Sequence, residues 1–192
     1  MWITSRDFKI LFEAASPLEK MILALGGTMG LRRTELASVR LDDISGNSLT
    51  VTGKGVSSGK IIEMEMSGLV SKVLPAYLKW RQEILSKFGD RSEGYLLINP
   101  YEKHTGKRLS PSVLTIIALR LRDKTGVIWT LHSLRRLYCM TMVDAGVELD
   151  TTRRMMRHSS VNTTINAYIK ADPRKLHKAM SAVDDTFSVL MG

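Results

Sequence analysis

The sequence of 192 residues predicts a mainly α-helical domain with one small antiparallel β-sheet, an α+β arrangement. Most of the chain carries apolar residues at helical spacing, behind polar or proline starts. Only residues 48–66 alternate with a period of two, around a glycine-rich turn. The length fits one domain, and no apolar run approaches the roughly 18 residues of a membrane span.

The N-terminal third predicts three helices. Apolar residues recur at helical spacing in TSRDFKILFEAA (residues 4–15). SPLEKMILAL (residues 16–25) opens with Ser-Pro and places a glutamate three residues after the serine, which is the pattern of a capping box. We expect Gly26, Gly27 and Gly30 to break this second helix, and a short third helix to resume at about Thr34.

The middle of the chain predicts the sheet and a long helix. SLTVTG (residues 48–53) and KIIEMEM (residues 60–66) are two short strands joined by the turn GKGVSSG. A helix follows over residues 70–88, in which Pro75 either introduces a bend or marks a late start. YLLIN (residues 95–99) is a candidate for another short strand.

The rest of the chain predicts helices only. Ser110 and Pro111 open a helix over residues 112–124 that Gly126 ends. Four further helices are expected over residues 132–146, 150–158, 162–169 and 172–187.

Charge and cysteine content limit the functional classes. The chain has 28 Lys plus Arg against 19 Asp plus Glu, a net charge of +9, and a basic domain of this kind usually binds a polyanion, most often nucleic acid. The single cysteine, Cys139, allows no disulfide framework and no cysteine-based zinc site within one chain, which suits a reducing compartment. With no apolar segment at the N-terminus, these features predict a cytoplasmic protein without a membrane partner.

Residues suited to a phosphodiester occur in four places along the chain. GLRRTEL holds Arg32 and Arg33, the hairpin tip GKG holds Lys54, LHSLRR holds His132 and Arg135, and HSSVNTTINAY holds His158 and Tyr168. Taken singly, each has an ordinary alternative. An arginine or lysine is most often a solvated surface charge, a histidine a satisfied polar group or helix cap, and a tyrosine a core aromatic.

Taken together and in this order, the four segments resemble the catalytic domain of the tyrosine recombinases, the phage integrase family. The family signature is an arginine in a GLR-x-[ST]-E-L box, a hairpin lysine, an H-x-L-R box, an H-[ST] box and a tyrosine soon after it. The resemblance extends from about Ser5 to Ile169. It implies the tyrosine recombinase catalytic-domain fold and a site-specific recombinase or integrase, encoded by a virus or other mobile element.

The resemblance also implies a mechanism. Tyr168 would attack the phosphorus and form a 3′-phosphotyrosyl bond while a 5′-hydroxyl leaves, and the 5′-hydroxyl of a partner strand would then rejoin the DNA. No metal or cofactor is expected, because the covalent intermediate keeps the bond energy. A forked guanidinium donates two hydrogen bonds to non-bridging oxygens, which assigns Arg32 and Arg135 to the phosphate.

The remaining roles follow from the same resemblance. His158 would hydrogen-bond the scissile phosphate, and Lys54 would protonate the leaving oxygen, with Lys60 as a rival for that role. His132 would act beside Arg135 as an acid/base or phosphate contact. Glu35 would orient the basic groups. The implied partners are double-stranded DNA and a homotetramer formed on it, weakly associated or monomeric without DNA.

The match departs from the family pattern in four respects. Arg157 stands where members usually have glycine, so it is an alternative to His158 for the phosphate contact. The interval from His158 to Tyr168 is ten residues, one more than is usual, and Arg33 occupies a commonly apolar place, which leaves it a backbone-phosphate role or none. We expect residues 1–192 to form a single catalytic domain without the N-terminal clamp domain.

Two other functions fit parts of the sequence. A type IB topoisomerase shares the chemistry but relaxes DNA without exchanging partners. TTRRMMRHSSVNTTINAYI (residues 151–169) is also compatible with a non-catalytic helix-turn-helix, although that reading leaves the arginines and the lysine unexplained.

Overall fold

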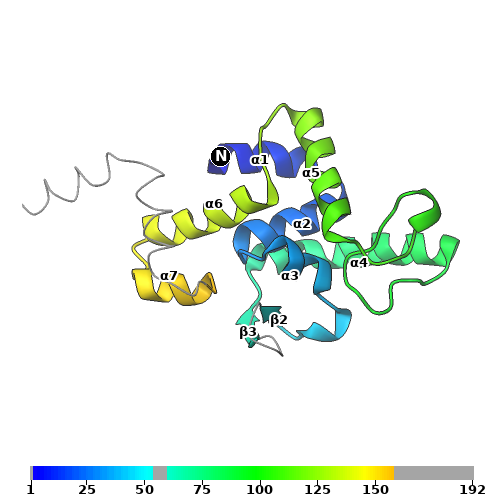
Figure 1. The fold of residues 1–192 in the computed structure, drawn as a ribbon, viewed down its shortest axis with the longest axis horizontal. Helices are drawn as coiled ribbons and strands as arrows, with labels where there is room; N and C mark the ends of the chain where they lie inside the picture. The colour runs from blue at the N-terminus through cyan, green and yellow to red at the C-terminus, as the bar shows by residue number, and fades with distance from the viewer. Residues whose placement is uncertain (1, 54–59, 158–192) are drawn as a thin grey trace, which may run out of the picture. The chain divides into compact units, whose positions relative to one another are not determined.

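The computed structural model describes residues 2–53 and 60–157 and confirms the predicted fold class, mainly α with a small antiparallel sheet (Figure 1). The chain divides into two compact units, Met1–Tyr138 and Cys139–Gly192. In chain order the elements are α1 (Ser5–Ala14), α2 (Pro17–Thr28), α3 (Arg33–Ser38), the 3-10 turn η1 (Leu41–Asp43), β1 (Ile44–Ser45), β2 (Ser48–Gly53), β3 (Lys60–Glu65), α4 (Gly68–Phe88), the 3-10 turn η2 (Glu102–His104), α5 (Pro111–Thr125), α6 (Leu131–Asp144) and α7 (Leu149–Met155).

Side-chain caps set the helix starts where the sequence places them. The Thr4 hydroxyl accepts from the Asp7 backbone N–H and the Asp7 carboxylate accepts from the Thr4 N–H, closing a capping box at α1. Ser16 and Glu19 form the same box at α2. Such caps satisfy amide groups that have no partner inside the helix, which is why these boundaries were predictable.

The sheet has three antiparallel strands in the order β1-β2-β3. In its register Leu49 lies opposite Met64 and Val51 opposite Ile62. Leu49 and Val51 are buried, so alternate residues of β2 face the core, as a period of two requires. The sequence predicted β2 and β3 but not β1, whose two residues are too few to show any periodicity.

One expectation about helix α2 was wrong, and one of the two alternatives for Pro75 in helix α4 is excluded. Gly26 and Gly27 lie inside α2, which ends at Thr28, before Gly30. Both positions need glycine, because an added Cβ would lie 2.9 Å from Leu134 and 2.5 Å from Phe8. Pro75 lies inside α4, which begins at Gly68 behind the cap of Ser67, so a late start is excluded. Helices α2 and α4 pack against each other in the core, and α5 packs on α1 and α3.

The predicted strand YLLIN is also wrong. Residues 95–99 are largely buried, but Tyr95 and Ile98 form only isolated bridges, with Arg40 and Arg108, and the two residues between them lie in a bend. Side chains of α4 replace a strand ladder: the Leu96 carbonyl accepts from the Tyr77 hydroxyl at 2.8 Å and from Arg81 Nε at 3.2 Å. Backbone groups of a buried segment must find partners, and here side chains provide them.

The second unit holds α7, predicted over residues 150–158 and observed to end at Met155. The helices expected over residues 162–169 and 172–187 lie outside the described residues. Within residues 2–53 and 60–157, no helix combines the length and apolar content that crossing a membrane requires.

Candidate functional site

The turn between α2 and α3 places the first arginine of the site. Gly30 has a φ of +61°, in the left-handed region, and an added Cβ would lie 2.4 Å from Cδ1 of the Tyr138 ring. Only glycine avoids both the backbone strain and the collision. The turn leaves Arg32 at the N-cap position of α3, so its side chain projects from the start of that helix.

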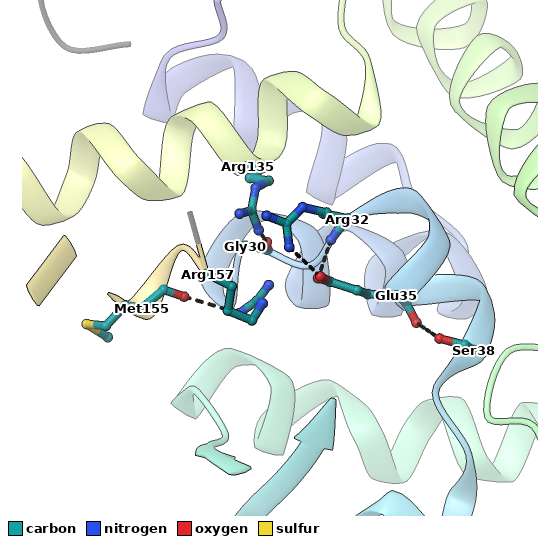
Figure 2. A network of polar contacts seen from close by, with 7 residues as sticks. All are labelled: Gly30, Arg32, Glu35, Ser38, Arg135, Met155 and Arg157. Carbon is teal, nitrogen blue, oxygen red and sulfur yellow. Dashed lines mark hydrogen bonds and ion pairs between the residues drawn. The ribbon is translucent and has the colours of Figure 1, made fainter. Parts of the chain in front are cut away.

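Glu35 holds Arg32 in place. The Glu35 carboxylate, 2% exposed, accepts from Arg32 Nη1 at 2.6 Å and from the Arg32 backbone N–H at 2.8 Å (Figure 2). An acidic side chain three residues after the cap satisfies an unpaired helix amide and also stabilises the nearby guanidinium. The Arg32 side chain keeps 31% of its surface exposed and is therefore accessible to a ligand.

Arg135 on α6 supplies a second guanidinium from a distant part of the sequence. It is 3% exposed and donates a hydrogen bond to the Gly30 carbonyl, two residues before Arg32. Figure 2 shows its side chain beside that of Arg32. Two cations brought together in this way create a strongly positive position, which suits an anion with two or more oxygen acceptors.

His132 lies one turn before Arg135 on the same helix and is solvent-exposed. Partial burial, followed by the nearby charges of Arg136, Arg135 and Arg32, lowers its pKa below the usual 6.5. The imidazole is therefore mainly neutral at pH 7, with one ring nitrogen donating a hydrogen bond and the other accepting one. In this form it can take up a proton at the accepting nitrogen.

The structure thus brings together three of the six predicted catalytic residues, Arg32, His132 and Arg135. Lys54, His158 and Tyr168 lie outside the described residues. Among residues 2–53 and 60–157, no group of three or more His, Cys, Asp or Glu side chains is arranged to hold a metal ion. The described part of the site is suited to binding a phosphate or another oxyanion.

Two features of the site were not predicted from the sequence. The Gly30 carbonyl anchors Arg135, and Arg33 Nη1 donates to Thr115 Oγ1 at 3.2 Å, which ties α3 to α5. For the Gly30 contact, the sequence offered only a glycine two residues before Arg32. For the Arg33 contact, no local pattern predicts a hydrogen bond between residues 82 apart. Arg33 therefore has a structural partner, and its backbone-phosphate role stays a prediction.

Arg157, at the end of the second unit's described part, has a φ of +54°. Its backbone N–H donates to the Arg154 carbonyl and its Nη1 to the Met155 carbonyl at 3.1 Å. A positive φ is strained for a residue with a Cβ and is the conformation that glycine adopts readily. Glycine, which the resemblance led us to expect at this position, would adopt this conformation without strain.

Comparison with known proteins gives consistent results. Residues 2–175 match the model of the phage integrase family. Tyrosine recombinase XerA of Pyrococcus horikoshii is 24% identical over 191 residues, covering 99% of this chain and 64% of the relative. Transposase A from transposon Tn554 of Staphylococcus aureus is 26% identical over 174 residues, covering 87% of this chain and 48% of the relative.

Solved structures show the same fold. The crystal structure of XerA recombinase superposes with a TM-score of 0.77 at 21% identity, covering 95% of this chain and 64% of that chain. XerH site-specific recombinase bound to a palindromic difH substrate gives 0.68 at 15% identity, covering 96% and 53%. The chain thus spans about half to two thirds of the length of these relatives. By its match over residues 2–175, the chain belongs to the phage integrase family.

Proposed function

We propose that this chain is the catalytic part of a site-specific DNA recombinase of a mobile element, which cleaves and rejoins duplex DNA through a 3′-phosphotyrosyl bond on Tyr168. The observation that carries the proposal is the convergence of Arg32 and Arg135 beside a neutral His132. In this proposal residues 1–192 act as one catalytic domain. The similarity to XerA and to a Tn554 transposase supports the reaction class and the mobile-element origin.

The arginine pair explains how a phosphodiester becomes reactive. Attack by an oxygen nucleophile increases the negative charge on the two non-bridging oxygens of the phosphate. Guanidinium groups fixed in advance stabilise that charge without reorganising at the moment of reaction. Here Glu35 holds the Arg32 guanidinium in place, and the Gly30 carbonyl holds that of Arg135.

The nucleophile and the acid complete the proposal. A tyrosine hydroxyl has a pKa near 10 and reacts as the phenolate, which a cluster of positive groups favours. His158 would hydrogen-bond the scissile phosphate, and Lys54 would protonate the departing 5′ oxygen. His132 would hold or pass a proton beside Arg135. The energy of the phosphodiester stays in the phosphotyrosyl bond, so the reaction needs no nucleotide cofactor.

The proposed partners are double-stranded DNA and further copies of the chain. The DNA-bound XerH structure and a λ integrase dimer bound to a core site, which has a TM-score of 0.62, support a duplex substrate. A homotetramer on DNA is the proposed assembly, in the cytoplasm of a prokaryotic host. Apolar residues recur at helical spacing after Tyr168, namely Leu176, Ala179, Met180, Val183 and Phe187, and would dock on the next subunit. Deleting residues 174–192 should then reduce DNA-dependent oligomers and leave the monomer folded, whereas loss of folding would show that these apolar residues pack on their own domain.

The test of the proposal is a covalent adduct. The chain is incubated with sheared, nicked DNA of its source organism, in which short strand ends diffuse away after cleavage and prevent rejoining. Adducts that survive denaturation are isolated on the protein, and the attached DNA is sequenced. We expect adducts at one sequence with the wild type and none with Tyr168→Phe. Equal recovery from the two proteins, or none from either, would contradict the proposal.

A plasmid assay separates the alternative of a topoisomerase. A recombinase should leave a supercoiled plasmid that lacks the recovered sequence unchanged, whereas a type IB topoisomerase relaxes it. If no adduct forms but the chain binds duplex DNA, a non-catalytic binding module is supported instead.

A sulfur substitution tests the role of Lys54. A thiolate leaves without protonation, so a bridging 5′ sulfur removes the need for an acid. Lys54→Ala should cleave ordinary DNA slowly and the sulfur substrate at nearly the wild-type rate. Rescue of Lys60→Ala instead would transfer the role to Lys60.

A further inference from the structure

Tyr95 lies under two arginines on the surface of the first unit. The guanidinium carbon of Arg40 is 4.9 Å from the centre of the Tyr95 ring, and that of Arg108 is 4.3 Å from it. Arg108 Nη1 also donates to the Tyr95 hydroxyl at 2.8 Å. These three residues are called the arginine–tyrosine stack below. Stacking on an aromatic face orients a guanidinium and leaves its N–H groups directed outward in the ring plane.

Buried polar groups hold the stack in position. Arg81 on α4, 6% exposed, donates to the Tyr95 carbonyl at 3.0 Å and to Ser92 Oγ at 2.6 Å. On the other side, the Leu96 N–H donates to the Val39 carbonyl at 2.8 Å, which fixes Tyr95 next to Arg40. A buried guanidinium is costly unless it is well bonded, so this network specifies the backbone at Tyr95 firmly.

In the described part of the chain, the guanidinium groups of the stack form no ion pair, although the Asp43 carboxylate accepts from the Arg40 backbone N–H at 2.7 Å. Among residues 2–53 and 60–157, neither Arg40 nor Arg108 forms an ion pair with a carboxylate, in contrast to Arg122, which pairs with Asp123 at 3.2 Å. Because each lies within 5 Å of one ring centre, the two guanidinium carbons are within about 10 Å of each other. Two like charges this close repel, and an anion between or beside them would relieve the repulsion. The Tyr95 hydroxyl, which accepts from Arg108, can donate its own hydrogen to the same anion.

Helix α3 links the stack to the candidate site. Arg32 caps the start of this helix of six residues, and Arg40 follows its last residue, Ser38, by two positions. At 1.5 Å per helical residue and about 3.3 Å per extended residue, the two backbones are at most about 16 Å apart. Duplex DNA advances about 3.4 Å per base pair, so this length of chain spans no more than four or five base pairs.

We propose that the arginine–tyrosine stack binds backbone phosphates of the same duplex, several base pairs from the phosphate held by Arg32 and Arg135. The inference rests on the proposed function, because it takes duplex DNA as the ligand. Neighbouring phosphates of one strand advance about 3.4 Å along the axis, so two guanidinium groups within about 10 Å of each other can reach two phosphates of the same strand. Contacts of this kind position a protein on DNA without reading sequence.

Salt titration tests the inference. The 192-residue chain is titrated onto a fluorescein-labelled duplex of about 30 base pairs at several KCl concentrations, and log Kd is plotted against log salt. Each lost phosphate contact should reduce the slope by about 0.9, so Arg108→Ala should lower it by about 0.9 and Arg40→Ala with Arg108→Ala by about 1.8. The same slope makes each contact worth roughly eightfold in affinity at 0.1 M salt relative to 1 M salt.

Matched variants separate a specific contact from loss of charge or fold. Arg122→Ala removes the same charge from an arginine that already has an acidic partner, and should change the slope by less than about 0.3. Arg108→Lys keeps the charge and should keep most of the slope. Arg108 is exposed, and its truncation removes one surface hydrogen bond and one stacking contact, so the unfolding temperature should fall by no more than about 2–4 °C. Equal slopes for Arg108→Ala and Arg122→Ala would overturn the inference, as would a slope that falls only together with the unfolding temperature.

The outcome is independent of the test of catalysis. A chain that binds the duplex with the predicted slopes but forms no Tyr168 adduct would support the stack and contradict the recombinase. If the chain forms the adduct but Arg108→Ala leaves the salt slope unchanged, the recombinase is supported and the phosphate contact of the stack is contradicted. A wild type that does not bind duplex DNA would overturn both.

Discussion

Replacing Glu35 by glutamine should uncouple Arg32 from the site while keeping the size of the side chain. Glu35 is 2% exposed and accepts two hydrogen bonds from Arg32, one from Nη1 at 2.6 Å and one from the backbone N–H at 2.8 Å. A glutamine keeps one acceptor oxygen, and its NH2 group then faces one of the two Arg32 donors and cannot accept from it. The guanidinium then loses its fixed direction at the start of α3.

The expected magnitude follows from burial and exposure. Removing one partner of a buried ion pair costs about 3–5 kcal/mol, and the partial exposure of Arg32, 31%, reduces this to about 2 kcal/mol. For a chain of this size that corresponds to a fall of about 4–8 °C in the unfolding temperature. A displacement of about 1 Å in a group that stabilises the transition state lowers the rate on the order of 100-fold. We expect a fall of this size in the rate of adduct formation.

Glu19→Gln is the matched control, since Glu19 occupies the same capping-box position in α2 and accepts from the Ser16 N–H at 2.7 Å without an arginine partner. Glutamine is accepted in that box, so both stability and adduct rate should stay near the wild type. The measurements are thermal unfolding by circular dichroism and the single-turnover rate of adduct formation. If Glu35→Gln and Glu19→Gln behaved alike, the role of Glu35 in orienting Arg32 would be refuted.

Three further predictions concern single residues. Because the pKa of His132 lies below 6.5, adduct formation should fall as pH drops through that lowered pKa. The unfolded chain binds this proton more tightly than the folded chain, so the free energy of unfolding should also fall as the solution is acidified over this range. Both pH effects should be smaller in His132→Gln, measured by adduct rate and by urea unfolding. Gly30→Ala combines a positive φ with a Cβ 2.4 Å from Tyr138 and should lower the free energy of unfolding in urea by about 2–4 kcal/mol. Gly46→Ala, with a φ of +56° and open space around it, should lower it by about 1 kcal/mol. Equal losses in the two variants would mean that the Tyr138 ring moves away freely. Arg157→Gly should stabilise the chain by about 0.5–1 kcal/mol by relieving a φ of +54°, and a tenfold loss of adduct rate in this variant would assign the phosphate contact to Arg157 over His158.

Local rules account for what the sequence predicted correctly in the fold. Thr4, Ser16 and Ser110 cap the helices they precede, since capping depends only on residues within one turn. Gly26 and Gly27 were misread because their role depends on Leu134 and Phe8, whose proximity no local pattern encodes.

Segment 95–99 was misread for a related reason. Its residue types fit a strand, but its backbone is bonded partly by the side chains of Tyr77 and Arg81 and partly by scattered backbone groups such as the Val39 carbonyl, without a continuous ladder. Such side chains are chosen by tertiary packing, which overrides the preference of a short apolar segment.

The candidate site shows the same division. Arg32, His132 and Arg135 were predictable because their boxes recur in order along the chain, and the structure places them together. The Gly30 carbonyl as the anchor of Arg135 was not predictable, because the two residues are 105 apart and the bond involves a backbone atom. Order along the chain indicates which residues are candidates for the site, whereas the groups that hold them in place are recognised only in the folded structure.

The central claim, that Arg32 acts on the non-bridging oxygens of the phosphate attacked by Tyr168, can be measured with a methylphosphonate. Replacing one non-bridging oxygen by methyl removes the negative charge that the guanidinium is proposed to stabilise. On ordinary DNA of the sequence recovered from the adducts, Arg32→Ala should form adduct at least about 1,000-fold more slowly than the wild type. On a duplex with methylphosphonate at the scissile position, the variant should approach the wild-type rate, with its fold confirmed by circular dichroism. If a folded Arg32→Ala remained equally slow on both substrates, Arg32 would not act on the phosphate oxygens and the account would be contradicted.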